Sequence, residues 1–331
     1  MAEITINQAI QSYLEILETT RSKHTLLTYR NALNYFCDVL GIHHIDFQTD
    51  SLMKLTEEAI GWLAASLKDL SPATEQLYIT ATAGFYEYLV AENMADFNLT
   101  RIHQLIRHRT RRPGLRLPQF PYHAIEQVII YMINLINNQI DNESEKLRLF
   151  RDRAFLLTLA DTGMRVHEAC NLRRGDVDWQ EGRAIIIGKG DRQAVVRFSQ
   201  RSLQALKIYL SLRASLDGAS GRPLRSLPVF ARHDKGAGKK IKPITTTTGR
   251  NIVAYWVSVI LGPEEAGTIT PHSFRHYFVT RVLHKSGNLK LAQELARHKS
   301  ISVTQRYAHL SDSELDQGYY EVFETKNKEN R

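Results

Sequence analysis

The sequence predicts an α+β protein, mostly helical with one small β-sheet, in which a helical domain is followed by a larger domain that carries the sheet. Three observations lead to this prediction. The chain has 331 residues, more than one ordinary hydrophobic core accommodates. Most of its apolar residues recur at the spacing of amphipathic helices. Two short apolar runs, 184–187 and 194–198, flank a glycine-containing turn and indicate a β-hairpin.

Four helices are expected before residue 100. Apolar residues at helical spacing predict the first, which starts near Ile6. Ser22 can cap a second helix that ends at Gly41. Thr56 and Ser71–Pro72 mark the starts of the third and fourth. The residues that we expect in the core are Ile6, Ala9, Ile10, Tyr13, Leu14 and Leu17, then Tyr29, Leu33 and Phe36, and in the fourth helix Leu77, Phe85, Tyr88 and Leu89.

A basic stretch with two prolines separates the domains, which we expect at 1–100 and 121–331 with a linker at 101–120. No acidic residue occurs between Asp96 and Glu126. Such a stretch, and a lysine-rich loop further along the chain, suit the phosphates of a nucleic acid, while a solvated linker is the alternative. The candidate DNA-binding residues are Arg107, Arg109, Arg111, Arg112, Arg116, Lys239 and Lys240.

The second domain begins with helices expected at 122–137 and 147–160. A further helix follows Gly163 and bears Arg165 and Glu168, and the predicted hairpin places Lys189 at or beside its turn. The remainder is predicted to be mainly helical, with helices at 202–212, 250–261, 274–283 and 290–296.

The composition of the chain indicates its cellular compartment and the kind of partner it binds. The formal net charge of +8 favours a polyanionic partner. No apolar run approaches the roughly 18 residues of a membrane span, and the N-terminus has no secretory pattern, so we expect a cytoplasmic protein. The two cysteines, Cys37 and Cys170, are expected to be buried and reduced. Neither a metal-binding cluster nor a nucleotide-binding loop is recognisable, so no cofactor is expected.

Five motifs follow one another in the second domain: Thr162–Glu168, Gly188–Gly190, His272–His276, Arg297–His298 and Thr304–His309. In this order and with these gaps they resemble the successive signatures of the tyrosine recombinases, also called the phage integrase family, and most closely its Xer-type and integrase branches. The resemblance covers residues from about 150 to 310. It implies a two-domain tyrosine recombinase architecture, and the helical N-terminal part is similar in pattern to the family's core-binding, SAM-like domain.

A tyrosine flanked by cationic groups suits attack on a phosphodiester. A free phenol has a pKa near 10, so about one in a thousand is ionised at neutral pH and Tyr307 needs a base or a cationic setting. Arg165 and Arg275 would each bind non-bridging oxygens of the phosphate. Tyr319 and Tyr320 are the rivals for the nucleophile, but acidic neighbours would raise a phenol pKa and repel phosphate.

The remaining roles follow from the resemblance and the chemistry together. His272 is the candidate base for the phenol proton, and His298 would donate to the phosphate. Lys189 would protonate the departing 5′ oxygen, and Glu168, one helical turn after Arg165, would orient that guanidinium. Two further histidines in the motifs, His276 and His309, are expected to support these groups rather than react.

One position departs from the family pattern. Where the family usually has Leu-Gly-His, this chain has Ala296, Arg297 and His298. A position that favours glycine can require a positive φ, so the local backbone is of special interest. The alternative role for Arg297 is an additional phosphate contact.

The resulting functional prediction is a site-specific DNA recombinase that cleaves and rejoins strands through a covalent 3′-phosphotyrosyl intermediate and a Holliday junction. Two alternatives stay open: relaxation of DNA in the manner of a type IB topoisomerase, and a catalytically silent DNA-binding regulator. The expected partners are double-stranded DNA sites and three further copies of the chain, assembled in part through an amphipathic tail around Leu315 and Tyr319. The sequence does not identify the target site, the biological role or any accessory protein.

Overall fold

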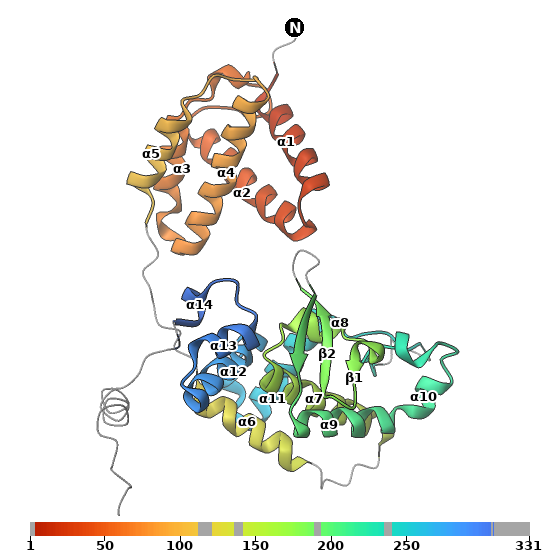
Figure 1. Ribbon diagram of the computed structural model, residues 1–331. Helices are drawn as coiled ribbons and strands as arrows, with labels where there is room; N and C mark the ends of the chain where they lie inside the picture. The colour runs from red at the N-terminus through yellow and green to blue at the C-terminus, as the bar shows by residue number, and fades with distance from the viewer. Residues whose placement is uncertain are drawn as a thin grey trace, which may run out of the picture. The chain divides into compact units, whose positions relative to one another are not determined.

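The computed structural model describes residues 4–111, 121–135, 142–188, 193–234, 240–305 and 307. The chain divides into two compact units, Met1–Arg116 and Leu117–Arg331 (Figure 1). The first unit is helical, and the second combines helices with a three-stranded antiparallel sheet. The predicted fold class is confirmed. Within the described ranges, no helix combines the length and the apolar character needed to cross a lipid bilayer.

The first unit is built from amphipathic helices that begin at side-chain caps. Thr5 and Gln8 form a capping box at its first helix, and Ser22 and Ser71 cap the second and fourth as predicted. All six apolar residues predicted for the first helix are buried. The elements are α1 (Ile6–Thr20), α2 (Lys23–Ile42), η1 (Leu52–Lys54), α3 (Glu58–Ser66), η2 (Leu67–Asp69), α4 (Pro72–Ala91) and α5 (Leu99–Arg109).

Two expectations for this unit are corrected. Residues 99–109 form α5 rather than the start of a linker, because Asn98 caps the helix and Ile102 is buried in the core of the unit. Leu77 is not a core residue, because it is 39% exposed. It faces away from the core of the unit, unlike Ile79 and Phe85 on the same helix, which are buried. The domain boundary therefore falls after α5.

The second unit is organised around one nearly fully buried helix, α7. From Phe150 to Thr162 almost every residue of α7 is buried, since α6, α9 and α12 all pack against it. The elements are α6 (Tyr122–Asn134), α7 (Glu143–Thr162), α8 (Val166–Asn171), η4 (Arg174–Asp176), β1 (Val177–Asp178), β2 (Arg183–Ile187), β3 (Gln193–Arg197), α9 (Gln200–Leu212), α10 (Ala214–Gly218), η5 (Leu224–Ser226), α11 (Thr246–Leu261), η7 (Pro263–Glu265), α12 (Pro271–Ser286), α13 (Leu289–Ala296) and α14 (Ile301–Gln305).

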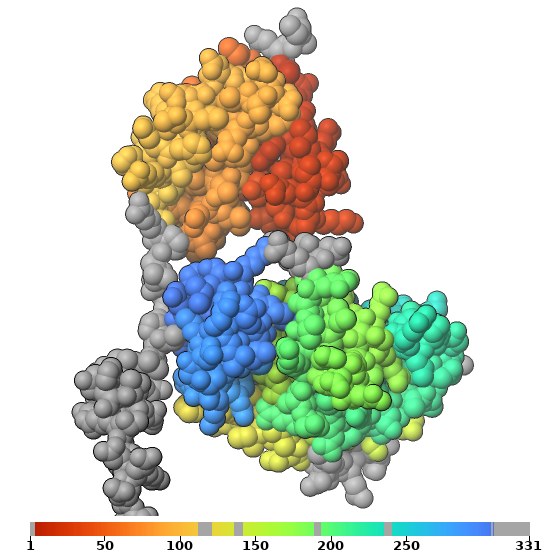
Figure 2. Space-filling model, viewed as in Figure 1, coloured from red at the N-terminus to blue at the C-terminus, as the bar shows by residue number. Residues whose placement is uncertain are grey.

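The sheet has the strand order β1-β2-β3, with Ile185 paired to Val195 in the β2–β3 hairpin. Ala184 and Ile186 face the core, while Ile185 and Val195 are exposed. The hairpin is the one predicted, but its turn, with Lys189, lies outside the described residues. The hairpin strands, in green, and the α12–α14 segment, in blue, are both visible on the face of this unit seen in Figure 2. Both cysteines are free and buried, as expected.

Candidate active site

Four segments of the second unit bring together five of the six predicted catalytic residues, all except Lys189, which lies outside the described ranges. Arg165 is the residue that precedes α8, and His272 and Arg275 lie in the first turns of α12. His298 follows α13, and Tyr307 follows α14. These segments form one cluster because α12 packs on both α7 and α13, and α13 packs on α14.

Arg165 is held at one edge by Glu168. The two oxygens of this carboxylate accept from the Arg165 backbone N–H at 2.8 Å and from its Nη1 at 2.9 Å. The Glu168 side chain is 1% exposed, whereas that of Arg165 is 43% exposed. One edge of the guanidinium is therefore fixed to the protein, while its other N–H groups stay accessible to a ligand. A planar guanidinium in this state can bind two phosphate oxygens.

Arg275 is buried and anchored by backbone carbonyls from two other segments. Its Nη1 donates to Gly163 O at 2.5 Å, and its Nη2 donates to Ala296 O. Burial, together with the nearby guanidiniums of Arg165 and Arg297, lowers the pKa of Arg275 to about 9. Cations that repel one another in a partly dry site favour a bound anion, because the anion relieves the repulsion.

Gly163 is required where it stands. It ends α7 with a φ of 59°, and an added Cβ would lie 2.4 Å from a ring carbon of Phe278. Its carbonyl is the acceptor for Arg275, so this turn links the end of α7 to that arginine.

The three histidines of the cluster are neutral at physiological pH. Burial is the main cause, and neighbouring charges add to it: the pKa values of His276 and His298 are lowered to about 4, and that of His272 is also lowered. The rings of His272 and His276 meet edge to face at 4.2 Å between centroids. His298 Nδ1 lies 2.9 Å from the Thr304 hydroxyl, which orients that imidazole.

The hydroxyl of Tyr307 contacts His276 rather than His272, the base expected from sequence. It hydrogen-bonds Nδ1 of His276, and the two rings lie 5.2 Å apart. The sequence predicts only a supporting role for His276. Its spacing carried a usable signal, because residues 272 and 276 lie one helical turn apart and so share a face of α12.

Arg297 adopts the left-handed backbone that the family's glycine suggested, with φ 58° and ψ 43°. Its side chain does not extend outward into solvent. It is 11% exposed and turns inward, where Nη2 donates to Glu168 Oε2 at 2.9 Å. The contacts of Nη2 are thus with the protein itself, and the additional phosphate contact stays a prediction.

The predicted DNA contacts fall into three groups. Arg107 and Lys240 are exposed, and Arg109 is exposed with its guanidinium lying over Gly61, where a Cβ would come within 1.8 Å of Nη1. Arg111 instead binds the buried carboxylate of Glu75, with Nε 2.6 Å from Oε2. A side chain tied to a buried carboxylate is not free to neutralise a phosphate. The predicted DNA contacts that lie outside the described ranges are Arg112, Arg116 and Lys239.

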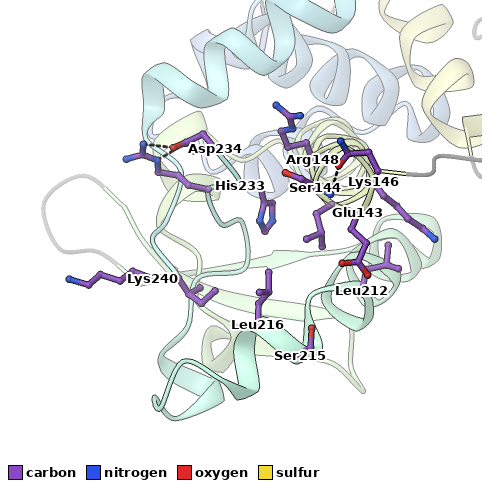
Figure 3. Close-up of a pocket in the computed structure, with 14 residues that line it drawn as sticks. Glu143, Ser144, Lys146, Arg148, Leu212, Ser215, Leu216, His233, Asp234 and Lys240 are labelled. Atoms are coloured by element: carbon purple, nitrogen blue, oxygen red, sulfur yellow. Dashed lines mark hydrogen bonds and ion pairs between the residues drawn. The ribbon is translucent and has the colours of Figure 1, made fainter. Parts of the chain in front are cut away.

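A cavity of about 910 Å³ lies elsewhere in the second unit, between the start of α7, the α9–α10 region and the loop after Ala231 (Figure 3). His233 contributes to its lining and bonds the hydroxyl of buried Tyr209 at 2.8 Å. Lys240 stands at its edge and points away from the other labelled side chains. None of the catalytic candidates within the described ranges lines this cavity.

A helical domain with one small sheet, and a tyrosine grouped with two arginines and three histidines, are the features of a tyrosine recombinase. Residues 132–314 match the phage integrase family, and residues 10–93 match the phage integrase N-terminal SAM-like domain. The first match alone covers more than half of the chain, which therefore belongs to the phage integrase family.

Relatives and solved structures agree with this assignment. The tyrosine recombinase XerC of Treponema denticola is 28% identical over 319 residues, which are 95% of this chain and 98% of the relative. XerC of Bacillus subtilis is 28% identical over 309 residues, which are 93% and 92% of the two chains. The XerH site-specific recombinase bound to its difH substrate shares the fold, with a TM-score of 0.62 at 20% identity over 96% of this chain and 84% of that one. The chain is a tyrosine site-specific recombinase, and it acts on DNA.

Proposed function

We propose that Tyr307 is the nucleophile that cuts DNA and that Arg165 and Arg275 bind the phosphate it attacks. The observation that carries this proposal is the contact of the Tyr307 hydroxyl with the neutral imidazole of His276, beside the guanidinium of Arg275. Tyr307 lies near enough to Arg275 to affect the pKa of its guanidinium. A phenol placed between a base and cations is activated as a nucleophile at neutral pH.

The strand cleavage then proceeds as a simple exchange of oxygens at phosphorus. The phenolic oxygen of Tyr307 forms a bond to the scissile phosphorus, and the bond from phosphorus to the 5′ oxygen breaks. Nδ1 of His276 takes the phenol proton, and Lys189 supplies a proton to the departing 5′ oxygen. His298 donates to a non-bridging oxygen. The 3′-phosphotyrosyl ester keeps the energy of the broken bond, so a 5′ hydroxyl from another strand reverses the step.

At the level of the assembly, four protomers on two DNA sites would cleave and exchange strands in pairs through a Holliday junction. The amphipathic tail after Ser311, which lies outside the described residues, would join neighbouring protomers. A cytoplasmic location is part of the same proposal, and the two buried free thiols of Cys37 and Cys170 suit a reducing compartment.

A duplex that carries a nick near the cleavage position tests the nucleophile, because release of a short strand traps the covalent adduct. We expect the wild type to form an adduct that peptide mapping assigns to Tyr307. Tyr307→Phe should form none while binding duplex with unchanged affinity. Tyr255→Phe, which removes the phenol of a 59% exposed tyrosine on α11, is the matched control and should react normally.

Two outcomes would contradict the proposal. An adduct that persists in Tyr307→Phe, or one that maps to Tyr319 or Tyr320, would assign the nucleophile to the tail. Loss of duplex binding in Tyr307→Phe would mean that the side chain serves binding rather than chemistry. Joining of two different duplexes by the wild type separates recombination from relaxation of a single duplex.

A further inference from the structure

Arg297 occupies its position at a cost that its own contacts do not explain. A residue with a Cβ is strained in the left-handed region, which glycine enters freely, yet Arg297 has a φ of 58°. Its Nε and Nη1 are buried and hydrogen-bond to no group in the described part of the chain. Unsatisfied buried donors are unfavourable. A side chain kept in such a place is better explained by what it does for its neighbours.

The neighbour that it serves is Glu168. This carboxylate accepts from three donors: the backbone N–H of Arg165, Nη1 of Arg165, and Nη2 of Arg297 at 2.9 Å. Arg165 and Arg297, which lie in different segments of the chain, thus bind the same buried carboxylate. Arg165 remains largely open to solvent, whereas Arg297 is enclosed. The two arginines therefore have different roles, one toward the ligand and one toward the protein.

Arg297 also contacts the anchor of the second phosphate-binding arginine. Its Nη2 lies 3.3 Å from Gly163 O, the carbonyl that accepts from Nη1 of Arg275. One guanidinium at the end of α13 thus reaches the supports of both Arg165 and Arg275. The loop after α13, which carries His298, is by the same contacts fixed to the turn after α7.

We propose that Arg297 is a positioning residue for strand cleavage, which locks Glu168 in place so that Glu168 holds the Arg165 guanidinium ready for the scissile phosphate. The inference rests on the proposed function, in which Arg165 binds that phosphate. In this role Arg297 acts through Glu168 rather than on the reacting atoms.

The charges around Glu168 agree with this role. The groups that face it are the guanidiniums of Arg165, Arg275 and Arg297. Burial raises the pKa of the Glu168 carboxyl, but Arg297 and the hydrogen bonds from Arg165 outweigh burial and bring it below the ordinary value. Without Arg297 this pKa should rise, and protonation of Glu168 at acidic pH would release Arg165.

The substitution Arg297→Gly tests the role directly, because glycine keeps the left-handed backbone and removes the guanidinium. Adduct formation on the nicked duplex should slow by roughly 10- to 100-fold, since small misplacement of a phosphate-binding group is costly to the chemical step. Duplex affinity should not fall, and any fall in melting temperature should be small, because Arg165 still pairs with Glu168 and glycine relieves the left-handed backbone. As the pH is lowered, the cleavage rate of Arg297→Gly should begin to decrease at a higher pH than that of the wild type. Arg297→Lys keeps the charge but not the planar guanidinium. Its pH profile should therefore be closer to that of the wild type than its cleavage rate is.

Two comparisons keep the test specific. Asn93→Gly relieves the same kind of backbone strain in the first unit, at a φ of 54°, and should leave cleavage unchanged. Glu168→Gln should itself slow cleavage, and adding Arg297→Gly to it should cause little further loss, because both changes break one chain of contacts.

The outcomes separate the inference from the proposed function. A wild-type cleavage rate and pH profile in Arg297→Gly would overturn the positioning role while leaving Tyr307 as the nucleophile. The same conclusion would follow if the double variant lost cleavage rate by the full product of the two single-variant factors. A loss explained entirely by earlier melting would also overturn it. Absence of any adduct in the wild type would refute the proposed function and the inference with it.

Discussion

Replacing Arg111 by alanine should destabilise the first unit rather than weaken its hold on DNA. The carboxylate of Glu75 on α4 is fully buried, and Arg111 provides its ion pair at 2.6 Å as well as a backbone N–H bond at 2.8 Å. The same guanidinium donates to Leu70 O at 2.7 Å. Removing the guanidinium leaves a buried charge with only the backbone donor from residue 111.

The magnitude follows from the burial of Glu75. Breaking a buried pair by removal of one partner costs about 3–5 kcal/mol. We expect the lower end, about 3 kcal/mol, because the backbone N–H of residue 111 stays and the Arg111 side chain is 39% exposed. For a unit of this size such a loss lowers the melting temperature by about 10 °C.

Hydrogen exchange of α4 amides in the full-length protein, followed as a function of urea, measures the stability of this unit alone. Arg107→Ala removes an exposed arginine of α5 and should change stability by less than about 0.5 kcal/mol. Replacing Glu75 and Arg111 together by methionine should recover most of the loss, since no buried charge then remains.

The pH dependence has a definite sign. Burial raises the pKa of Glu75, but the bonds from Arg111 outweigh it and the net pKa lies below the ordinary value. Such a group stabilises the fold above its unfolded pKa of about 4.3, and this stabilisation is lost as the pH falls through the lower folded value. The difference in free energy of unfolding between the wild type and Arg111→Ala should therefore narrow below about pH 4. The ion-pair interpretation would be refuted by a different result: Arg111→Ala as stable as Arg107→Ala, with the slope of log DNA affinity against log salt concentration flattened by about 0.9.

Two further predictions concern catalysis and assembly. His276→Ala should slow adduct formation by about 10²- to 10⁴-fold, and His272→Ala by less, because the Tyr307 hydroxyl contacts His276; a larger loss in His272→Ala, measured in the same single-turnover assay, would restore His272 as the base. Truncation after Ser311 should leave single-site binding and the melting temperature nearly unchanged but abolish cooperative binding to two sites in gel-shift titrations, because the tail is proposed to join protomers; retained cooperativity, or much earlier melting, would mean that the tail packs on its own protomer.

Local structure was largely predictable from sequence because its causes are local. Helix starts at Ser22 and Ser71 were found because a hydroxyl side chain caps the free N–H groups of the first turn wherever it occurs. The β2–β3 hairpin is predictable because its two short apolar runs and its turn lie within about 15 residues. Where the burial of a residue depends on several neighbouring helices, as for Leu77 on α4, the pattern misassigned it.

By itself, the sequence determined which reactive groups the protein has: the order of its motifs identified the family and named a tyrosine, two arginines and their histidines. Only the tertiary structure decided which groups touch. Gly163 and Arg275 are 112 residues apart in the chain, and their hydrogen bond exists because α12 packs against buried α7. The partners of Arg111, Arg297 and Tyr307 were likewise set by packing. Hydrogen bonds and ion pairs form over about 3 Å, and motif spacing along the chain does not specify separations on that scale.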